Sequence, residues 1–140
     1  MQKIILDTNV IISALISSNG IPGLIINNLV LEKRVQVCTS DEVTKEYFDV
    51  IKRPKFSANK MFLVNAEMVI SYINEIATNF SPHYKVHLIK DDSDNKFLEL
   101  ALESKADFLL TGNTNDFKIE KIGRTKIVPP AKYWNQFRPK

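Results

Sequence analysis

The chain of 140 residues has one cysteine, two histidines and no long apolar run. The single thiol, Cys38, excludes an intrachain disulfide and a zinc site built from several cysteines. It lies in an apolar run, which favours a buried, inert thiol over a nucleophile. No stretch reaches the roughly 18 to 20 apolar residues that cross a bilayer, and the first residues do not show a signal-peptide pattern. We therefore expect a cytoplasmic protein without a membrane segment.

Several familiar catalytic motifs are also absent. The sequence has no GxxxxGK[ST] phosphate loop, no GxGxxG fingerprint, no HExxH and no GxSxG. Nucleophilic serine or cysteine chemistry therefore has no support. His83 and His87 lie close together in the sequence but away from the acidic residues discussed below, so we expect neither to be a metal ligand or a general base. A net charge of +3 permits an anionic partner without indicating one.

Short apolar runs alternate with segments of helical periodicity. The runs predict strands at residues 3–6, 35–38, 86–89, 107–111 and 126–128. The clearest helix is amphipathic and is predicted over residues 59–80, where Pro82 closes it. The alternation predicts an α/β fold, with three α/β/α layers and a mainly parallel central sheet of four to five strands. No repeat or linker interrupts it, so we expect a single domain over residues 1–140.

Five acidic or amide side chains stand out because of their positions relative to these strands. Asp7 follows the first strand, and Asp94 follows the third. Asn113 and Asp116 follow the fourth, and Glu46 lies in the helix after the second. The carboxyl ends of parallel strands meet in one crevice, where carboxylates repel one another unless a cation lies among them. Oxygen ligands favour Mg²⁺ or Mn²⁺, so the pattern predicts a metal-dependent active site.

Some of these residues also have ordinary structural explanations. Asp7 could cap the helix that follows it, and one of the aspartates at the start of the helix at residues 93–104 could do the same. Among those aspartates Asp94 is the preferred ligand and Asp91 is the second choice. In the polar loop at residues 111–117, Gly and Asn residues suit a turn, whereas Thr and Asp residues also suit holding a metal or a water.

Helical periodicity separates Glu46 from its acidic neighbours. Val43 and Val50 belong to the buried stripe of the helix, and Glu46 lies at the edge of that stripe. Glu42 and Asp49 point further toward solvent. A solvated helix face explains those two residues, and Glu46 is predicted to face the crevice.

Taken in order, these segments resemble the PIN-domain family of small nucleases, in particular the branch described as toxin components of toxin–antitoxin pairs. The resemblance covers nearly the whole chain. The segments that carry it are residues 5–11, 40–47, 53–56, 91–101, 106–107 and 111–117.

The family's metal-binding acids map onto Asp7, Glu46 and Asp94, and its fourth acidic position falls in the polar loop after the fourth strand. Many members have an aspartate where this chain has Asn113, and Asp116 could supply the missing charge. The resemblance therefore implies a catalytic and metal-binding set of Asp7, Glu46, Asp94 and Asp116. The polar residues expected to support the ligands or the substrate are Thr8, Asn9, Asp91, Thr111 and Asn113.

The resemblance implies an endoribonuclease that hydrolyses phosphodiester bonds of single-stranded RNA with one or two Mg²⁺ or Mn²⁺ ions. It also implies an antitoxin protein as partner and a homodimer. Two basic clusters could contact phosphates or could simply be solvated surface: Lys52, Arg53, Lys55 and Lys60 around Pro54, and Lys121, Arg124 and Lys126 after the polar loop. Phe56 is a candidate for stacking on a base, although packing is the more common role of such a ring.

Two other classes of function stay open. An α/β phosphatase or phosphoacceptor domain also uses an aspartate at the end of a strand, although a phosphatase of the haloacid dehalogenase type needs a second aspartate at the place of Asn9. A PIN fold without catalysis, acting as a binding module, is the other alternative. Asn113, where many members have an acid, is compatible with it.

Overall fold

The computed structural model describes residues 1–87, 92–113 and 117–140, and for residues 92 and 93 the backbone only. Six strands form one sheet in the order β3-β2-β1-β4-β6-β5. Neighbouring strands are parallel, except that β5 and β6 are antiparallel. The strands are β1 (Lys3–Leu6), β2 (Gln36–Ser40), β3 (Thr78–Phe80), β4 (Phe108–Leu110), β5 (Lys121–Ile122) and β6 (Thr125–Val128).

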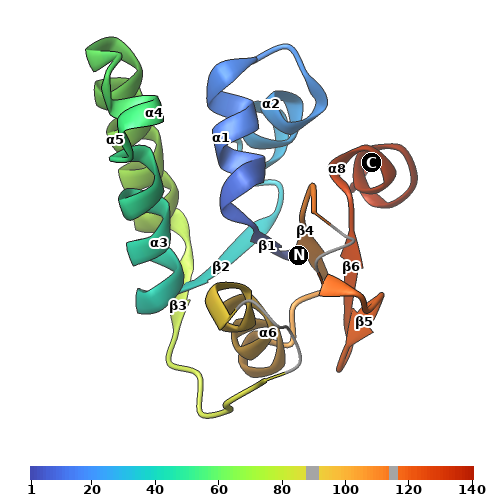
Figure 1. Cartoon of the computed structure of the whole chain (residues 1–140). Helices are drawn as coiled ribbons and strands as arrows, with labels where there is room; N and C mark the ends of the chain where they lie inside the picture. The colour runs from blue at the N-terminus through green and yellow to red at the C-terminus, as the bar shows by residue number, and fades with distance from the viewer. Residues whose placement is uncertain (88–91, 114–116) are drawn as a thin grey trace.

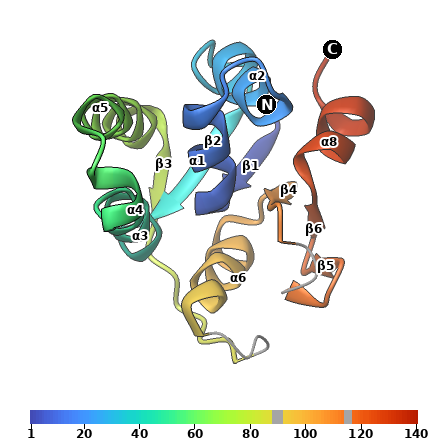
Figure 2. The same ribbon diagram turned by 45° about the horizontal axis from the view of Figure 1, so that its top comes forward.

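Helices flank this sheet (Figure 1). The α6 helix lies on one side of the strands, α1 and α2 lie on the other, and α3 packs beside α5 near β2 and β3 (Figures 1 and 2). The helices are α1 (Thr8–Ile16), α2 (Ile21–Ile25), η1 (Ile26–Val30), α3 (Asp41–Ile51), α4 (Pro54–Ser57), α5 (Lys60–Ile76), α6 (Asp92–Ser104), α8 (Pro130–Lys132) and η2 (Tyr133–Phe137). The prediction of an α/β fold with a mainly parallel sheet is confirmed.

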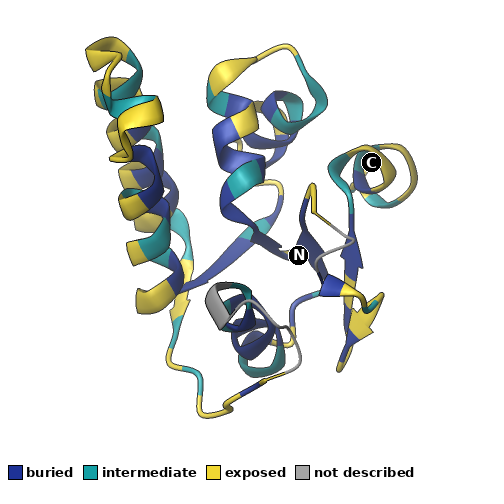
Figure 3. Cartoon of the chain, in the orientation of Figure 1, coloured by how far each residue is buried: buried dark blue, intermediate teal, exposed yellow. Residues whose placement is uncertain are grey.

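The inner strands are buried because helices cover both of their faces. Ile4, Ile5 and Leu6 of β1 are fully buried, as are Leu109 and Leu110 of β4. The buried strands contrast with the exposed outer surfaces of α3 and α5 in Figure 3. Burial on both faces explains why these strands are solid apolar runs rather than alternating ones.

The segment between α5 and α6 differs from the prediction. The helix ends at Ile76, and the residues that were expected to continue it form β3 instead, with Thr78 paired to Cys38 of β2. The strand predicted at residues 86–89 was wrong for Val86 and His87, which are not in a strand; residues 88 and 89 lie outside the described part. The Val86 amide donates to the Glu99 carboxylate of α6 at 3.0 Å, so a helix side chain takes the place of a neighbouring strand.

The sixth strand, β5, was not predicted. It pairs with β6 across the two-residue turn formed by Gly123 and Arg124. Gly123 has φ of +56°, a conformation that hairpin turns of this kind need and that glycine adopts without strain. A strand of two residues is too short to give a periodic signal, so β5 could not be recognised in the sequence.

No helix within residues 1–87, 92–113 and 117–140 is by itself long and apolar enough to cross a membrane. One bent pair, Thr8–Ile16 with Ile21–Val30, meets the criteria of length and composition jointly, across a bend of 100°.

Parallel pairing brings the residues that follow β1, β4 and β6 side by side. The Asp7 amide donates to the Leu110 carbonyl at 2.9 Å, and the Thr111 amide donates to the Val128 carbonyl at 3.1 Å. The sheet thus places the first residue after β1 next to the first residue after β4. This is the edge at which the sequence predicted an active site.

Candidate active site

A surface cavity of about 420 Å³ lies at this edge of the sheet. Three predicted acids line it: Asp7 directly after β1, Glu46 in the middle of α3 and Asp94 in the first turn of α6. Residues that are far apart in the sequence therefore converge on one cavity. The predicted supporting residues that also line it are Thr8, Asn9 and Asn113.

Asp7 is buried, with 5% of its surface exposed, and its carboxylate is hydrogen-bonded by the residue that follows the neighbouring strand β4. Thr111 Oγ1 donates to Asp7 Oδ2 at 2.6 Å, and the same hydroxyl accepts from the Asn113 amide at 3.0 Å. Asp7 precedes α1, but its side chain does not form a capping hydrogen bond with that helix. The alternative of a simple helix cap is therefore wrong, and Thr111, itself fully buried, positions the carboxylate.

Both carboxylate oxygens of Glu46 are engaged. Lys96 Nζ lies 3.0 Å from Glu46 Oε1, and the Thr8 hydroxyl donates to Glu46 Oε2. The two charged side chains are only 16% and 22% exposed, for Glu46 and Lys96 respectively. Glu42 and Asp49 on the same helix are exposed, which confirms the predicted helical phase.

A buried tyrosine ties α3 to the end of β1. The Tyr47 hydroxyl donates to the Leu6 carbonyl, one residue before Asp7. Burial raises the pKa of this phenol well above its ordinary value, and the negative charges of Asp7 and Glu46 raise it further. The phenol therefore stays protonated and remains a donor, so the hydrogen bond fixes the helix that carries Glu46 against the strand that precedes Asp7.

The start of α1 is joined to the loop after β4 in a similar way. The Gly112 amide donates to Asn9 Oδ1 at 3.2 Å. Two other predicted site residues, Asp91 and Asp116, lie outside the described residues, so the fourth acidic position is not described. The amide of Asn113 contributes to the network around Asp7, and its side chain lines the cavity.

The donor set suits a hard cation. The cavity is lined by the carboxylates of Asp7, Glu46 and Asp94 and by the hydroxyl of Thr8, all of them oxygen ligands. Within the described residues, however, no three His, Cys, Asp or Glu side chains are grouped closely enough to hold one ion. The ammonium of Lys96 already pairs with Glu46 Oε1, so an ion that binds Glu46 competes with Lys96 for this carboxylate.

Sequence reasoning did not assign a role to Lys96. It lies two residues after Asp94, a spacing that places the two side chains about 200° apart around a helix and gives no signal of a shared site. The long lysine side chain reaches Glu46 on α3 nevertheless. Only the packing of α6 against α3 shows this contact.

Basic and aromatic residues of α4 and its N-cap form one rim of the cavity. Arg53 and Lys55 line it and are exposed. Phe56 lines it as well, with its ring stacked on Phe62 at a centroid distance of 5.6 Å. Two of the four basic residues predicted to cluster around Pro54 thus lie beside the acids. His83, by contrast, forms an exposed pair with Glu103 at 2.7 Å, and neither histidine lines this cavity.

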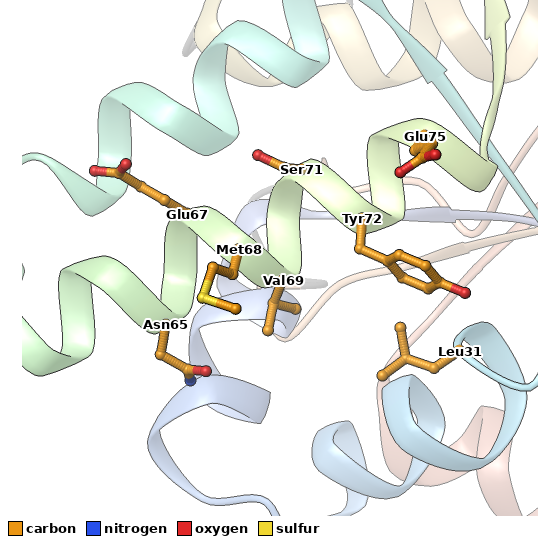
Figure 4. A pocket seen from close by; sticks show the side chains of 8 residues that line it. All are labelled: Leu31, Asn65, Glu67, Met68, Val69, Ser71, Tyr72 and Glu75. Carbon is orange, nitrogen blue, oxygen red and sulfur yellow. The ribbon is translucent and has the colours of Figure 1, made fainter.

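A larger cavity, of about 720 Å³, lies between α5 and Leu31 at the end of η1 and has a different character (Figure 4). Leu31, Met68 and Tyr72 give it an apolar lining, and Glu67 and Glu75 lie at its margin. None of the predicted site residues lines it. The convergence of acids, rather than the size of a cavity, therefore identifies the candidate active site.

A mainly parallel α/β sheet with acids gathered at one end of its strands fits a nuclease-type fold. Comparison with known proteins agrees, because residues 3–115 match the sequence model of the PIN domain. The chain is also similar to an uncharacterized protein, MJ1680, of Methanocaldococcus jannaschii, with 34% identity over 114 residues, which is 79% of this chain and 70% of that protein. The chain belongs to the PIN-domain family, whose members are generally nucleases and typically use divalent metal ions.

Proposed function

We propose that the protein is a metal-dependent endoribonuclease that hydrolyses phosphodiester bonds of single-stranded RNA in the cytoplasm. The observation that carries this proposal is the convergence of Asp7, Glu46 and Asp94 from three separate elements on one cavity. The cationic rim of Arg53 and Lys55 favours a phosphate-containing substrate over a neutral one. Membership of the PIN-domain family gives the phosphatase alternative no support.

In this proposal Asp7, Glu46 and Asp94 hold one or two Mg²⁺ or Mn²⁺ ions after moving closer together than they are in this structure, and Asp116 supplies the fourth acid. When bound, such an ion acts as a Lewis acid that neutralises phosphate charge and makes water a better nucleophile. The Thr111 hydroxyl donates to the Asp7 carboxylate and the Thr8 hydroxyl donates to the Glu46 carboxylate, so both acids are held in fixed orientations.

The α4 rim supplies the rest of the substrate site. The exposed side chains of Arg53 and Lys55 can pair with phosphates on either side of the bond that is cleaved. The half-buried ring of Phe56 stacks on the ring of Phe62, and this contact holds the Phe56 ring in place beside the cavity. A base that stacks there has to be unpaired, which favours single-stranded RNA.

The proposal is tested by incubating the protein with mixed single-stranded RNA and DNA, with Mn²⁺ or with EDTA. We expect cleavage of RNA with Mn²⁺ and none with EDTA. Glu46→Gln should lower the rate by more than about 100-fold, because even residues that only orient metal ligands contribute 10- to 100-fold. Glu42→Gln and Asp49→Asn remove the same charge from exposed positions of the same helix and should stay active.

A PIN-fold binding module without catalysis is the second candidate. The Lys96–Glu46 pair favours it, because an internal ammonium already occupies an oxygen that a metal would need. Binding of RNA in EDTA, with no cleavage at any Mn²⁺ concentration, would establish this function in place of the first. Equal loss of activity in Glu46→Gln, Glu42→Gln and Asp49→Asn would show that general charge, rather than the cavity, supports cleavage.

We also propose that the protein is the toxin of a toxin–antitoxin pair and forms a homodimer. An exposed apolar stripe on α5 supports a protein partner: Met61, Val64, Met68 and Tyr72 recur at helical spacing and are 81%, 57%, 67% and 41% exposed. If the antitoxin covers this stripe, Met68→Glu should release a small protein encoded beside this chain while light scattering still reports a dimer. Loss of the dimer with retention of the partner would assign the stripe to the homodimer instead.

A further inference from the structure

A third cavity, separate from the one beside α5 although its volume is also about 720 Å³, runs along β6 between β5 and the C-terminal helices. Its charged lining consists of one glutamate, Glu120, and four lysines. All four lysines are exposed, and they are Lys118, Lys121, Lys126 and Lys132. Within the described part of the chain no carboxylate lies within 4.0 Å of any of their ammonium groups. The cavity is therefore strongly cationic and its charge is not neutralised from within.

The hairpin places two of these charges against each other. Lys121 and Lys126 are directly opposite in the antiparallel pair of β5 and β6, so their side chains lie on the same face of the sheet. Like charges in this position destabilise a sheet. Arg124 of the same hairpin is different, because Asp107 pairs with it at 2.7 Å. The two lysines lack such a partner among the described residues, and an anion from outside would relieve their repulsion.

The Val128 end of this cavity is linked to the candidate active site by hydrogen bonds. Val128, which lines it, accepts a hydrogen bond from the Thr111 amide at 3.1 Å. Thr111 in turn donates to Asp7 at 2.6 Å. Two hydrogen bonds thus connect the wall of the lysine cavity to a buried acid of the active site. Lys126 lies further from this end, opposite Phe108, so a chain of phosphates would have to follow β6 away from the active site to reach the lysines.

We propose that the lysine cavity binds the phosphate backbone of the single-stranded RNA beyond the bond that is cleaved. This inference rests on the proposed ribonuclease function, and it assigns a second contact region to the same substrate. Neutralised phosphates release condensed counterions, so each contact contributes about 0.7 to the slope of log affinity against log salt concentration for single strands. Two contacts give a slope of about 1.4, so their contribution to the affinity is roughly 25-fold larger at about 0.1 M salt than at about 1 M salt.

The test is fluorescence anisotropy with labelled RNA of about 4 and about 16 nucleotides, the span of common single-strand site sizes. Binding is measured in an Asp7→Asn background so that the RNA stays intact. The double variant Lys121→Gln/Lys126→Gln should lose roughly 25-fold in affinity for the longer RNA, and its salt slope should fall by about 1.4. The preference for longer over shorter RNA should fall by the same factor.

The matched control is Lys45→Gln/Lys85→Gln, which removes the same charge from exposed positions on α3 and after β3, at the edge of the sheet farthest from β5. An equal loss in this control would mean that only net charge matters and would overturn the proposal. Unchanged RNA affinity, with new aggregation of the Lys121→Gln/Lys126→Gln variant, would also overturn it. The lysines would then protect the edge strand from pairing with other chains.

A cleavage assay with the two lysine variants in the otherwise unaltered chain separates this inference from the proposed function. If the parent protein cleaves RNA and the variant binds long RNA as tightly as the parent, the lysine cavity is not a binding site. If the parent cleaves no RNA but long RNA still requires the lysines for binding, the cavity binds RNA and the ribonuclease proposal is wrong.

Discussion

Removing one partner of the Lys96–Glu46 pair should destabilise the protein more than removing one partner of an exposed ion pair with a similar distance between its charged groups. The Lys96–Glu46 distance is 3.0 Å, and the side chains are 22% and 16% exposed. Their attraction is roughly 5 kcal/mol at an effective dielectric constant of about 20. Desolvation and the ordering of two side chains offset most of this energy. We expect a net coupling of about 1 to 2 kcal/mol, between the values for surface and for buried pairs.

The assay is a double-mutant cycle of urea unfolding in EDTA, with Lys96→Met, Glu46→Gln and the double variant. Methionine keeps most of the apolar length of lysine, so the cycle isolates the charge. Lys96→Met alone should lower the melting temperature by about 3 to 8 °C, since about 1 kcal/mol corresponds to roughly 3 to 5 °C in a chain of this size.

Lys45 and Asp49 provide the matched control on the same helix. Their distance is 2.9 Å, but their side chains are 78% and 56% exposed. Water screens an exposed pair four residues apart on a helix, so the Lys45→Met/Asp49→Asn cycle should give a much smaller coupling than the Lys96–Glu46 cycle. Equal couplings in the two cycles would refute the reasoning, because burial would then add nothing to the Lys96–Glu46 pair.

Three further predictions concern the metal, the fourth acid and the thiol. Millimolar Mn²⁺ should raise the melting temperature, because an ion that binds only the folded state stabilises it, and Asp7→Asn should reduce the shift; an unchanged melting curve would count against the site. Asn113→Asp should lower the Mn²⁺ concentration needed for half-maximal RNA cleavage, and Asp116→Asn should reduce the cleavage rate. If neither variant changes cleavage, the loop at residues 111–117 does not contribute the fourth acid. Burial raises the pKa of the Cys38 thiol to about 11, so iodoacetamide should label it at about pH 8 only after unfolding; rapid labelling of the folded protein would contradict this.

The sequence allowed the inner strands to be predicted, but not the edges of the sheet. Strands β1 and β4 are buried on both faces and therefore read as solid apolar runs. Strand β3 lies at the edge, and its first two residues, Thr78 and Asn79, are exposed, so it has no apolar signal. Conversely, Val86 is buried without being in a strand, and its amide donates to a carboxylate of α6 instead of to a neighbouring strand.

The same distinction applies to the candidate site. The position of Asp7 could be predicted because parallel strands end at one edge. Asp94 reaches the cavity from the first turn of α6 and not from a strand end, because Val86 and His87 of the expected strand are not in a strand. The phase of the α3 helix placed Glu46 on the correct side. The partners of these acids could not be predicted, since Thr111 and Lys96 reach them across 104 and 50 residues of sequence. Contacts of that kind depend on side-chain packing rather than on periodicity.

These partners link the stability of the metal-free protein to its affinity for metal. Asp7, Glu46 and Asp94 line one cavity, and without compensation their charges would oppose folding. The structure compensates with an ammonium and two hydroxyls, which are groups that also occupy the oxygens a cation would use. Strengthening this compensation stabilises the metal-free state and weakens metal binding, and weakening it does the reverse. Lys96→Met should therefore show both effects together, a lower melting temperature in EDTA and a larger shift on addition of Mn²⁺. If Lys96→Met lowered the melting temperature in EDTA but left the Mn²⁺-induced shift unchanged, Lys96 and the metal would not compete for Glu46.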